Sequence, residues 1–245
     1  MWTRVVKTLV FILINTLSFS PFALFSQNLY NTWLRGAIDI PVSPKLNTVI
    51  ELQHRRQSSM NTSDFVGGNV LTSYRNWVHY SYSPSLKLSV SPFAFFRHND
   101  IIHPTFESTD KTAKEFRFSL AVEMKEKMLN NFYFANRFAS EYRILSNRNI
   151  DIIRFRNRVG VNYLLSSKVN LSLSNEFILN IHKLNDYPLF NQNRTVLSTE
   201  LMALQDVKFE IGYIYLHRLI NHLPLQFKEH NLFLHLSYSL GKTSL

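Results

Sequence analysis

Residues Lys114–Met124 read KEFRFSLAVEM, and they show the clearest pattern in the chain. Every second residue from Phe116 to Met124 is apolar, and the residues between them are charged, polar or small. Successive side chains of a β-strand point to opposite faces, whereas a helix of period 3.6 would mix the two sets. The stretch therefore predicts a long strand with one apolar face and one polar face.

The same alternation recurs along the chain. It is clear again in His230–Leu240, where Leu232, Leu234, Leu236 and Tyr238 share one face. The pattern is noisier in nine further segments, so the sequence contains eleven candidate strands. The nine are Trp33–Ile40, Thr48–Arg56, Tyr74–Tyr82, Leu86–Arg97, Phe132–Ile144, Ile152–Tyr163, Val169–Asn180, Thr195–Ala203 and Phe209–Arg218.

The connections alternate in length as well. Longer loops follow Gln57, His98, Ile181 and Leu219, and the short connection after Leu145 is the exception. Long strands with short turns at one end and longer loops at the other are typical of transmembrane barrels. The short turns lie near Pro41–Asn47, Ser83–Ser85, Lys125–Asn130, Ser166–Lys168 and Gln205–Asp206.

We therefore expect an all-β fold, an antiparallel up-and-down transmembrane β-barrel of about 10–12 strands. Bacterial barrels close with an even number of strands. Eleven segments then imply that one is misassigned, with Trp33–Ile40 the first candidate, or that one strand is hidden. The alternative is a soluble periplasmic β-sandwich, whose strands would be about five or six residues long.

The N-terminal segment has the pattern of a signal peptide. Arg4 and Lys7 precede an uncharged apolar stretch, and no acidic residue occurs before Asp39. We expect residues 1–26 to be a signal peptide cleaved after Ser26, and residues 27–245 to form a barrel in the bacterial outer membrane. An uncleaved anchor is the alternative, which Pro21 disfavours because it interrupts the apolar run.

Composition limits the partners. The chain has no Cys, so it forms no disulfide and has no cysteine to carry the lipid of a lipoprotein. Its formal charge of +10 falls to +8 without Arg4 and Lys7. A basic balance often indicates nucleic acid, but export argues against that partner. The expected partners are outer-membrane lipid, lipopolysaccharide and a small anionic solute, and the oligomeric state is left open.

Charged residues gather on the polar face of consecutive segments. A turn at Ser166–Lys168 would place Arg158 opposite Glu176 and Arg154 opposite Asn180. Two interpretations stay open: an anion-selective constriction built from arginines, or a charged core that fills a narrow lumen, which we favour. The predicted network comprises Arg137, Glu141, Arg143, Arg154, Arg156, Arg158, Glu176 and Arg194.

Four motifs resemble those of a known family: RFASEYR at Arg137–Arg143, RFRNR at Arg154–Arg158, NEFILN at Asn175–Asn180 and FNQNR at Phe190–Arg194. This family is called domain of unknown function 2490, and consists of outer-membrane barrels found largely in Bacteroidota. The resemblance covers most of the mature chain and implies a fold and a location but no activity. Asn191 stands where the family pattern often has Asp.

The residues suited to catalysis form no recognisable site. His235 neighbours Ser237 on one strand face, but no acidic residue that would orient it is evident, so we predict no catalytic residue. The remaining histidines lack metal-ligand spacing, and we predict no metal and no cofactor. The other histidines and serines considered are His98, His103, His217, His222, His230 and Ser239; interfacial aromatic belts are expected from Tyr74, Tyr80, Tyr82, Phe132, Tyr213 and Tyr215.

Two functions from different classes therefore remain. The first is a non-enzymatic barrel that is structural or, in a porin-like way, conducts small solutes, with anions favoured. The alternative is a membrane-embedded lipid hydrolase. The sequence favours the first and does not decide whether the protein is an enzyme.

Overall fold

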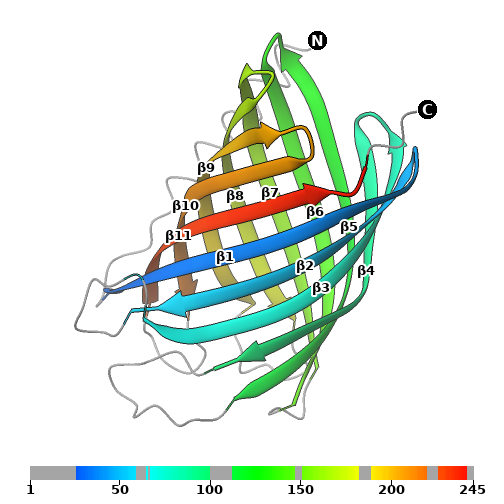
Figure 1. Cartoon of the computed structure of the whole chain (residues 1–245). Coiled ribbons are helices and arrows are strands. Elements are labelled where there is room, and N and C mark those ends of the chain that lie inside the picture. Colours follow the sequence, from blue (N-terminus) through cyan, green and yellow to red (C-terminus); the bar gives the residue numbers. More distant parts are fainter. Residues whose placement is uncertain are drawn as a thin grey trace.

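Eleven β-strands form one closed barrel in the part of the chain that the computed structural model describes, residues 26–58, 65, 67–99, 112–146, 151–181, 189–219 and 226–241 (Figure 1). They are β1 (Ser26–Ser43), β2 (Leu46–Gln57), β3 (Gly68–Ser83), β4 (Leu86–His98), β5 (Ala113–Leu129), β6 (Phe132–Leu145), β7 (Ile152–Ser166), β8 (Val169–Ile181), β9 (Phe190–Leu204), β10 (Val207–Leu219) and β11 (Gln226–Ser239). Each candidate segment corresponds to one strand, so the all-β barrel is confirmed. The expected signal peptide, apart from its last residue, lies outside the described residues. No helix among the described residues is long and apolar enough to span a membrane.

The barrel closes through a parallel pair. β1 runs parallel to β11, whereas every other neighbouring pair is antiparallel. The expectation of an even strand count was wrong: the described residues form eleven strands, and Trp33–Ile40 is not misassigned, since it lies within β1. With an odd number of alternating strands, the first and the last necessarily point the same way. A parallel ladder closes the wall with evenly spaced, slanted hydrogen bonds.

Buried side chains hold this seam from the inside. The Asn31 amide donates to Asn231 Oδ1 at 2.9 Å and to Glu229 Oε2 at 3.1 Å. An apolar cluster packs beside these residues and joins both strands of the seam to β10; its members are Trp33, Ile214, Leu216 and Phe233. The seam is therefore sealed by side chains as well as by the backbone ladder.

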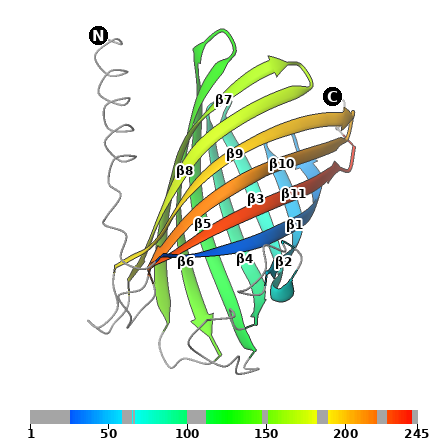
Figure 2. The same ribbon diagram turned by 90° about the vertical axis from the view of Figure 1, so that its left-hand side faces the viewer.

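The two rims of the barrel differ (Figures 1 and 2). At one end, here called the turn rim, adjacent strands are joined by two-residue turns at 44–45, 84–85, 130–131, 167–168 and 205–206. At the other end, the loop rim, longer connections join β2 to β3, β4 to β5, β6 to β7, β8 to β9 and β10 to β11. β1 and β11 both start at the loop rim and end at the turn rim.

The outer and inner faces follow the predicted alternation. In β5, Phe118 and Leu120 are 43% and 51% exposed on the outside, whereas Ser119 between them is 0% exposed in the lumen. Leu232, Leu234 and the other outward leucines of β11 are likewise exposed. The outer surface is thus a continuous apolar wall, which a monomer in water rarely presents.

Four asparagines on this wall bond one another in pairs. Asn157 donates to Asn136 at 2.9 Å, and Asn175 and Asn193 bond each other through both amides at 2.9 Å. Because buried polar groups are tolerated when they are hydrogen-bonded, these pairs are compatible with an apolar surrounding.

Aromatic residues lie toward both rims on the outside. Phe132 packs on Tyr163 at the turn rim, with ring centroids 4.6 Å apart. Toward the loop rim, the Tyr213 hydroxyl is bonded to His230, whose ring also packs against Tyr215. Tyr80 and Tyr82 belong to the turn-rim group, whereas Tyr74 lies inside β3 and packs against Phe93.

Candidate functional site

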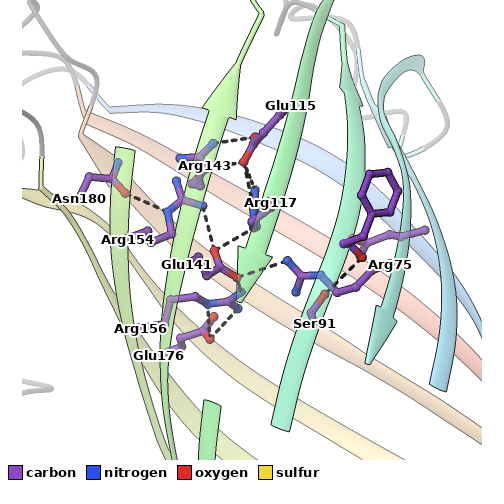
Figure 3. A network of polar contacts seen from close by, with 12 residues as sticks. Arg75, Ser91, Glu115, Arg117, Glu141, Arg143, Arg154, Arg156, Glu176 and Asn180 are labelled. Atoms are coloured by element: carbon purple, nitrogen blue, oxygen red, sulfur yellow. Dashed lines mark hydrogen bonds and ion pairs between the residues drawn. The ribbon is translucent and has the colours of Figure 1, made fainter. Parts of the chain in front are cut away.

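A buried carboxylate lies at the centre of the lumen. Glu141 of β6 is 1% exposed, and four guanidinium groups surround it (Figure 3). Arg117 of β5 donates to it at 3.1 Å, and Arg156 of β7 at 3.0 Å. Arg75 of β3 donates at 3.4 Å, and Arg154 lies 4.0 Å away. A carboxylate removed from water in this way is tolerable only because several cations and hydrogen bonds compensate it.

Two further glutamates continue this arrangement on either side. Glu115 of β5 is 0% exposed and accepts from Arg117 at 2.7 Å and from Arg143 at 2.5 Å. Its second oxygen, Oε2, lies 2.8 Å from Nε2 of His98. The side chain of Glu115 thus joins β4, β5 and β6 on the inner face.

Glu176 of β8 occupies the other side of Glu141. Its Oε1 accepts from Arg156 at 2.7 Å, and its Oε2 accepts from Arg194 at 3.2 Å. Because Arg117 and Arg156 each contact two glutamates, the ion pairs form one continuous chain from β3 to β9. We call this chain the central network; it comprises Arg75, Glu115, Arg117, Glu141, Arg143, Arg154, Arg156, Glu176 and Arg194.

The local reason for this gathering is strand register. Arg117 faces Arg143 across β5 and β6, and Glu141 faces Arg154 across β6 and β7, all on the inner wall. Glu141 and Glu176 therefore have arginines on both neighbouring strands, whereas Glu115 is paired with Arg143 on β6 and with His98 on β4. In the described residues, six arginines surround three glutamates, so the central network carries a net positive charge.

Aromatic rings pack against the guanidinium groups of several inner-wall arginines. The Arg117 guanidinium lies 4.0 Å from the centroid of Phe96. Arg55 lies 3.6 Å from the centroid of Trp33, and Arg194 approaches the same ring at 5.3 Å. Such cation–π contacts are strongest where water is excluded.

Six of the eight predicted network residues are brought together in the central network, and Arg137 and Arg158 are not. Arg137 lies 3.8 Å from Glu123. The predicted register of Arg158 with Glu176 is confirmed, but Arg156 and Arg194 occupy both oxygens of Glu176. Long side chains lean along the strand, so the residue directly opposite need not be the ionic partner.

Sequence reasoning missed Arg75, Glu115 and Arg117 as network members. Glu115 and Arg117 were visible on the polar face of KEFRFSLAVEM, and pairing that stretch across the following turn would have placed them beside Arg143. Arg75 carried no such signal, because its contact with Glu141 is made across the lumen and not between adjacent strands.

The candidate catalytic residues form only part of a catalytic arrangement. His235 Nδ1 lies 3.0 Å from Glu210, an acidic partner that the sequence did not reveal, and Ser198 donates to the same carboxylate at 2.8 Å. Among the described residues no hydroxyl is bonded to His235, and neither Ser237 nor Ser239 takes part. A nucleophile must lie within reach of its base, and that contact is missing.

The histidines that were considered as metal ligands, and rejected on their spacing, have other neighbours where the structure describes them. No group of three His, Cys, Asp or Glu residues that could hold a metal ion occurs in the described part of the chain. His98 is bound to Glu115, and the His217 ring lies 6.2 Å from Phe190. His103 and His222 are outside the described residues.

Comparison with solved structures gives three similar chains of the outer membrane protein OmpT of Vibrio cholerae: in-vitro folded, expressed in the outer membrane, and with loop L8 deleted. Their TM-scores are 0.37, 0.37 and 0.36, with 10%, 9% and 10% identity. The matches cover 71%, 71% and 70% of this chain and 54%, 55% and 56% of theirs, so the chain spans about half of their length. No curated protein matches the sequence. The family model that matches, over residues 30–221, is described as "Protein of unknown function (DUF2490)", and the chain belongs to this family.

Proposed function

We propose that the protein is a non-enzymatic barrel of the bacterial outer membrane, in the Bacteroidota, and that its central network closes the lumen as a charged core. The membrane location is supported by the apolar outer wall, by aromatic residues toward both rims and by the leader pattern of Arg4, Lys7 and the apolar residues after them. The protein then serves the envelope as a structural barrel that passes little solute.

The observation that carries this proposal is the burial of Glu141. A carboxylate lining an open aqueous path would stay hydrated, but this one is 1% exposed and bonded to arginines from three other strands. Arg75 reaches Glu141 from β3, although β4 and β5 lie between β3 and β6 in the wall. The surrounding side chains thus exclude water from this carboxylate.

Planar-bilayer recording tests the proposal. We expect the purified parent protein to show little steady conductance, and Arg75→Ala to raise it because one bridge across the lumen is removed. The matched control is Lys127→Ala, an exposed lysine of β5 near the turn rim, which should leave conductance unchanged. Large steady conductance in the parent would instead make anion passage the leading function.

The lipid hydrolase is the weaker alternative. The pair His235 and Glu210 is the single observation in its favour. That pair lies on the inner wall, away from lipid, and no hydroxyl among the described residues is bonded to His235. We therefore do not propose hydrolysis.

A further inference from the structure

Two arginines face each other on the inner wall, on the turn-rim side of the central network. Arg137 of β6 and Arg158 of β7 are direct cross-strand partners. Like charges in this position repel each other and destabilise the strand pair. A pair of this kind calls for an anion that neutralises both members.

The chain supplies too little negative charge for that purpose. Glu123 lies 3.8 Å from Arg137, but it also lies 3.0 Å from Lys87. Glu176 is in register with Arg158, yet both of its oxygens are bonded to other arginines. Among the described residues, the Arg158 guanidinium has neither a hydrogen bond nor an ion pair.

The two arginines differ in exposure, and the Arg137 side chain is 16% exposed. Arg158 is exposed although it points into the barrel, and the Lys87 and Glu123 side chains nearby are 38% and 27% exposed. On the same wall, nearer the turn rim, Lys125 and Lys127 are exposed. We call this part of the lumen, lined by Lys87, Glu123, Lys125, Lys127, Arg137 and Arg158, the turn-side vestibule. It is basic, and it lies between the turn rim and the central network.

We propose that Arg137 and Arg158 bind a phosphate-type oxyanion, carried by a small soluble solute that enters the turn-side vestibule. The planar fork of a guanidinium matches two oxygens of such a group, and two opposed forks can bind it together. The ring of Trp77, 5.1 Å from the Arg137 guanidinium, limits the freedom of one fork. Arg158 has no competing acceptor and turns toward the ligand.

Inorganic phosphate is the probe, and thermal unfolding of the folded barrel in neutral detergent is the readout, with sodium chloride at matched ionic strength as reference. We expect phosphate to raise the midpoint temperature of unfolding of the parent protein, and we expect this increase to saturate with phosphate concentration. Arg158→Gln should weaken the apparent affinity at least tenfold, whereas the control Lys114→Gln, an exposed lysine at the loop-rim end of β5, should leave it unchanged. Without phosphate, Arg158→Gln should unfold at a higher temperature than the parent, because the repulsion with Arg137 is gone. Arg158→Lys, which keeps the charge but loses the fork, should bind more weakly than the parent.

Two results would overturn the site: no saturable effect beyond that of chloride in the parent, or equal binding by the parent and Arg158→Gln. A second experiment distinguishes a soluble solute from a lipid headgroup as the source of the phosphate group. It replaces inorganic phosphate with mixed micelles of phosphatidylglycerol or phosphatidylcholine. A response to phosphatidylglycerol alone, lost in Arg158→Gln, would refute a soluble solute. The binding readout does not depend on conductance, so failure here is distinct from failure of the closed-lumen proposal.

Discussion

Arg75 on β3 and Glu141 on β6 meet at 3.4 Å, although β4 and β5 separate their strands in the barrel wall. Their contact therefore crosses the lumen and ties two parts of the wall that share no backbone hydrogen bond. Ion pairs between adjacent strands stabilise a local ladder, whereas this one also restrains the cross-section of the barrel.

Glu176→Gln should destabilise the barrel by about 3–5 kcal/mol, because Arg194 would lose its buried carboxylate partner and Arg156 one of its two. Equilibrium unfolding in detergent measures the loss, and planar-bilayer recording on the same variant should show little change in conductance. Glu200→Gln is the control, since that side chain is 38% exposed. Near-normal stability together with a stronger preference for anions would indicate that the arginines line a water-filled path.

Leu120→Arg should cost about 2–4 kcal/mol if Leu120 lies near the bilayer midplane, because a charge would face lipid. The same replacement at Leu234 is expected to cost a similar amount. Leu240→Arg, just beyond the end of β11 at the turn rim, is the depth control, with an expected cost of about 0–1 kcal/mol. Unfolding from lipid vesicles gives the three values, and equal tolerance at all three positions would speak against a membrane on this face.

Asn191→Asp should stabilise the barrel by about 1 kcal/mol, because a charge-assisted hydrogen bond is stronger than a neutral one. The Arg154 guanidinium already donates to Asn191 Oδ1 at 3.3 Å, and the central network has more arginines than glutamates. Asn193→Asp, two residues along the same strand, is the control: Asn193 pairs with Asn175 on the outer face, so a charge there should destabilise. A loss of stability in Asn191→Asp would show that the excess positive charge is already compensated.

Single cysteines should report the orientation of the barrel, since the chain has none of its own. Short turns of outer-membrane barrels face the periplasm. Thr112→Cys at the loop rim should then react with a membrane-impermeant maleimide on intact cells, and Ser85→Cys in a turn should react only after the outer membrane is permeabilised. The reverse pattern would mean that the barrel has the opposite orientation in the membrane. Labelling of both cysteine variants in intact cells would contradict the membrane location.

Strand positions, strand faces and hairpin register could be predicted from the sequence, because they depend on residues that are neighbours along the chain. The alternation in Lys114–Met124 identified a strand and separated its lipid-facing side from its lumen side, because the period of two is local. The turn at Ser166–Lys168 likewise determined the register of Arg158 with Glu176, since a tight hairpin leaves little choice of pairing.

The closure of the wall and the ion pairs inside it became clear only in the folded barrel. Nothing in the pattern of Trp33–Ile40 shows that its strand pairs in parallel with the last one, because that pairing joins the two ends of the sheet. The choice of Arg156 and Arg194 over Arg158 as partners of Glu176, and the reach of Arg75 to Glu141, depend on side chains converging from all sides of a closed barrel. The curvature and the closure of the barrel determine such contacts, and the spacing of residues along the chain encodes neither.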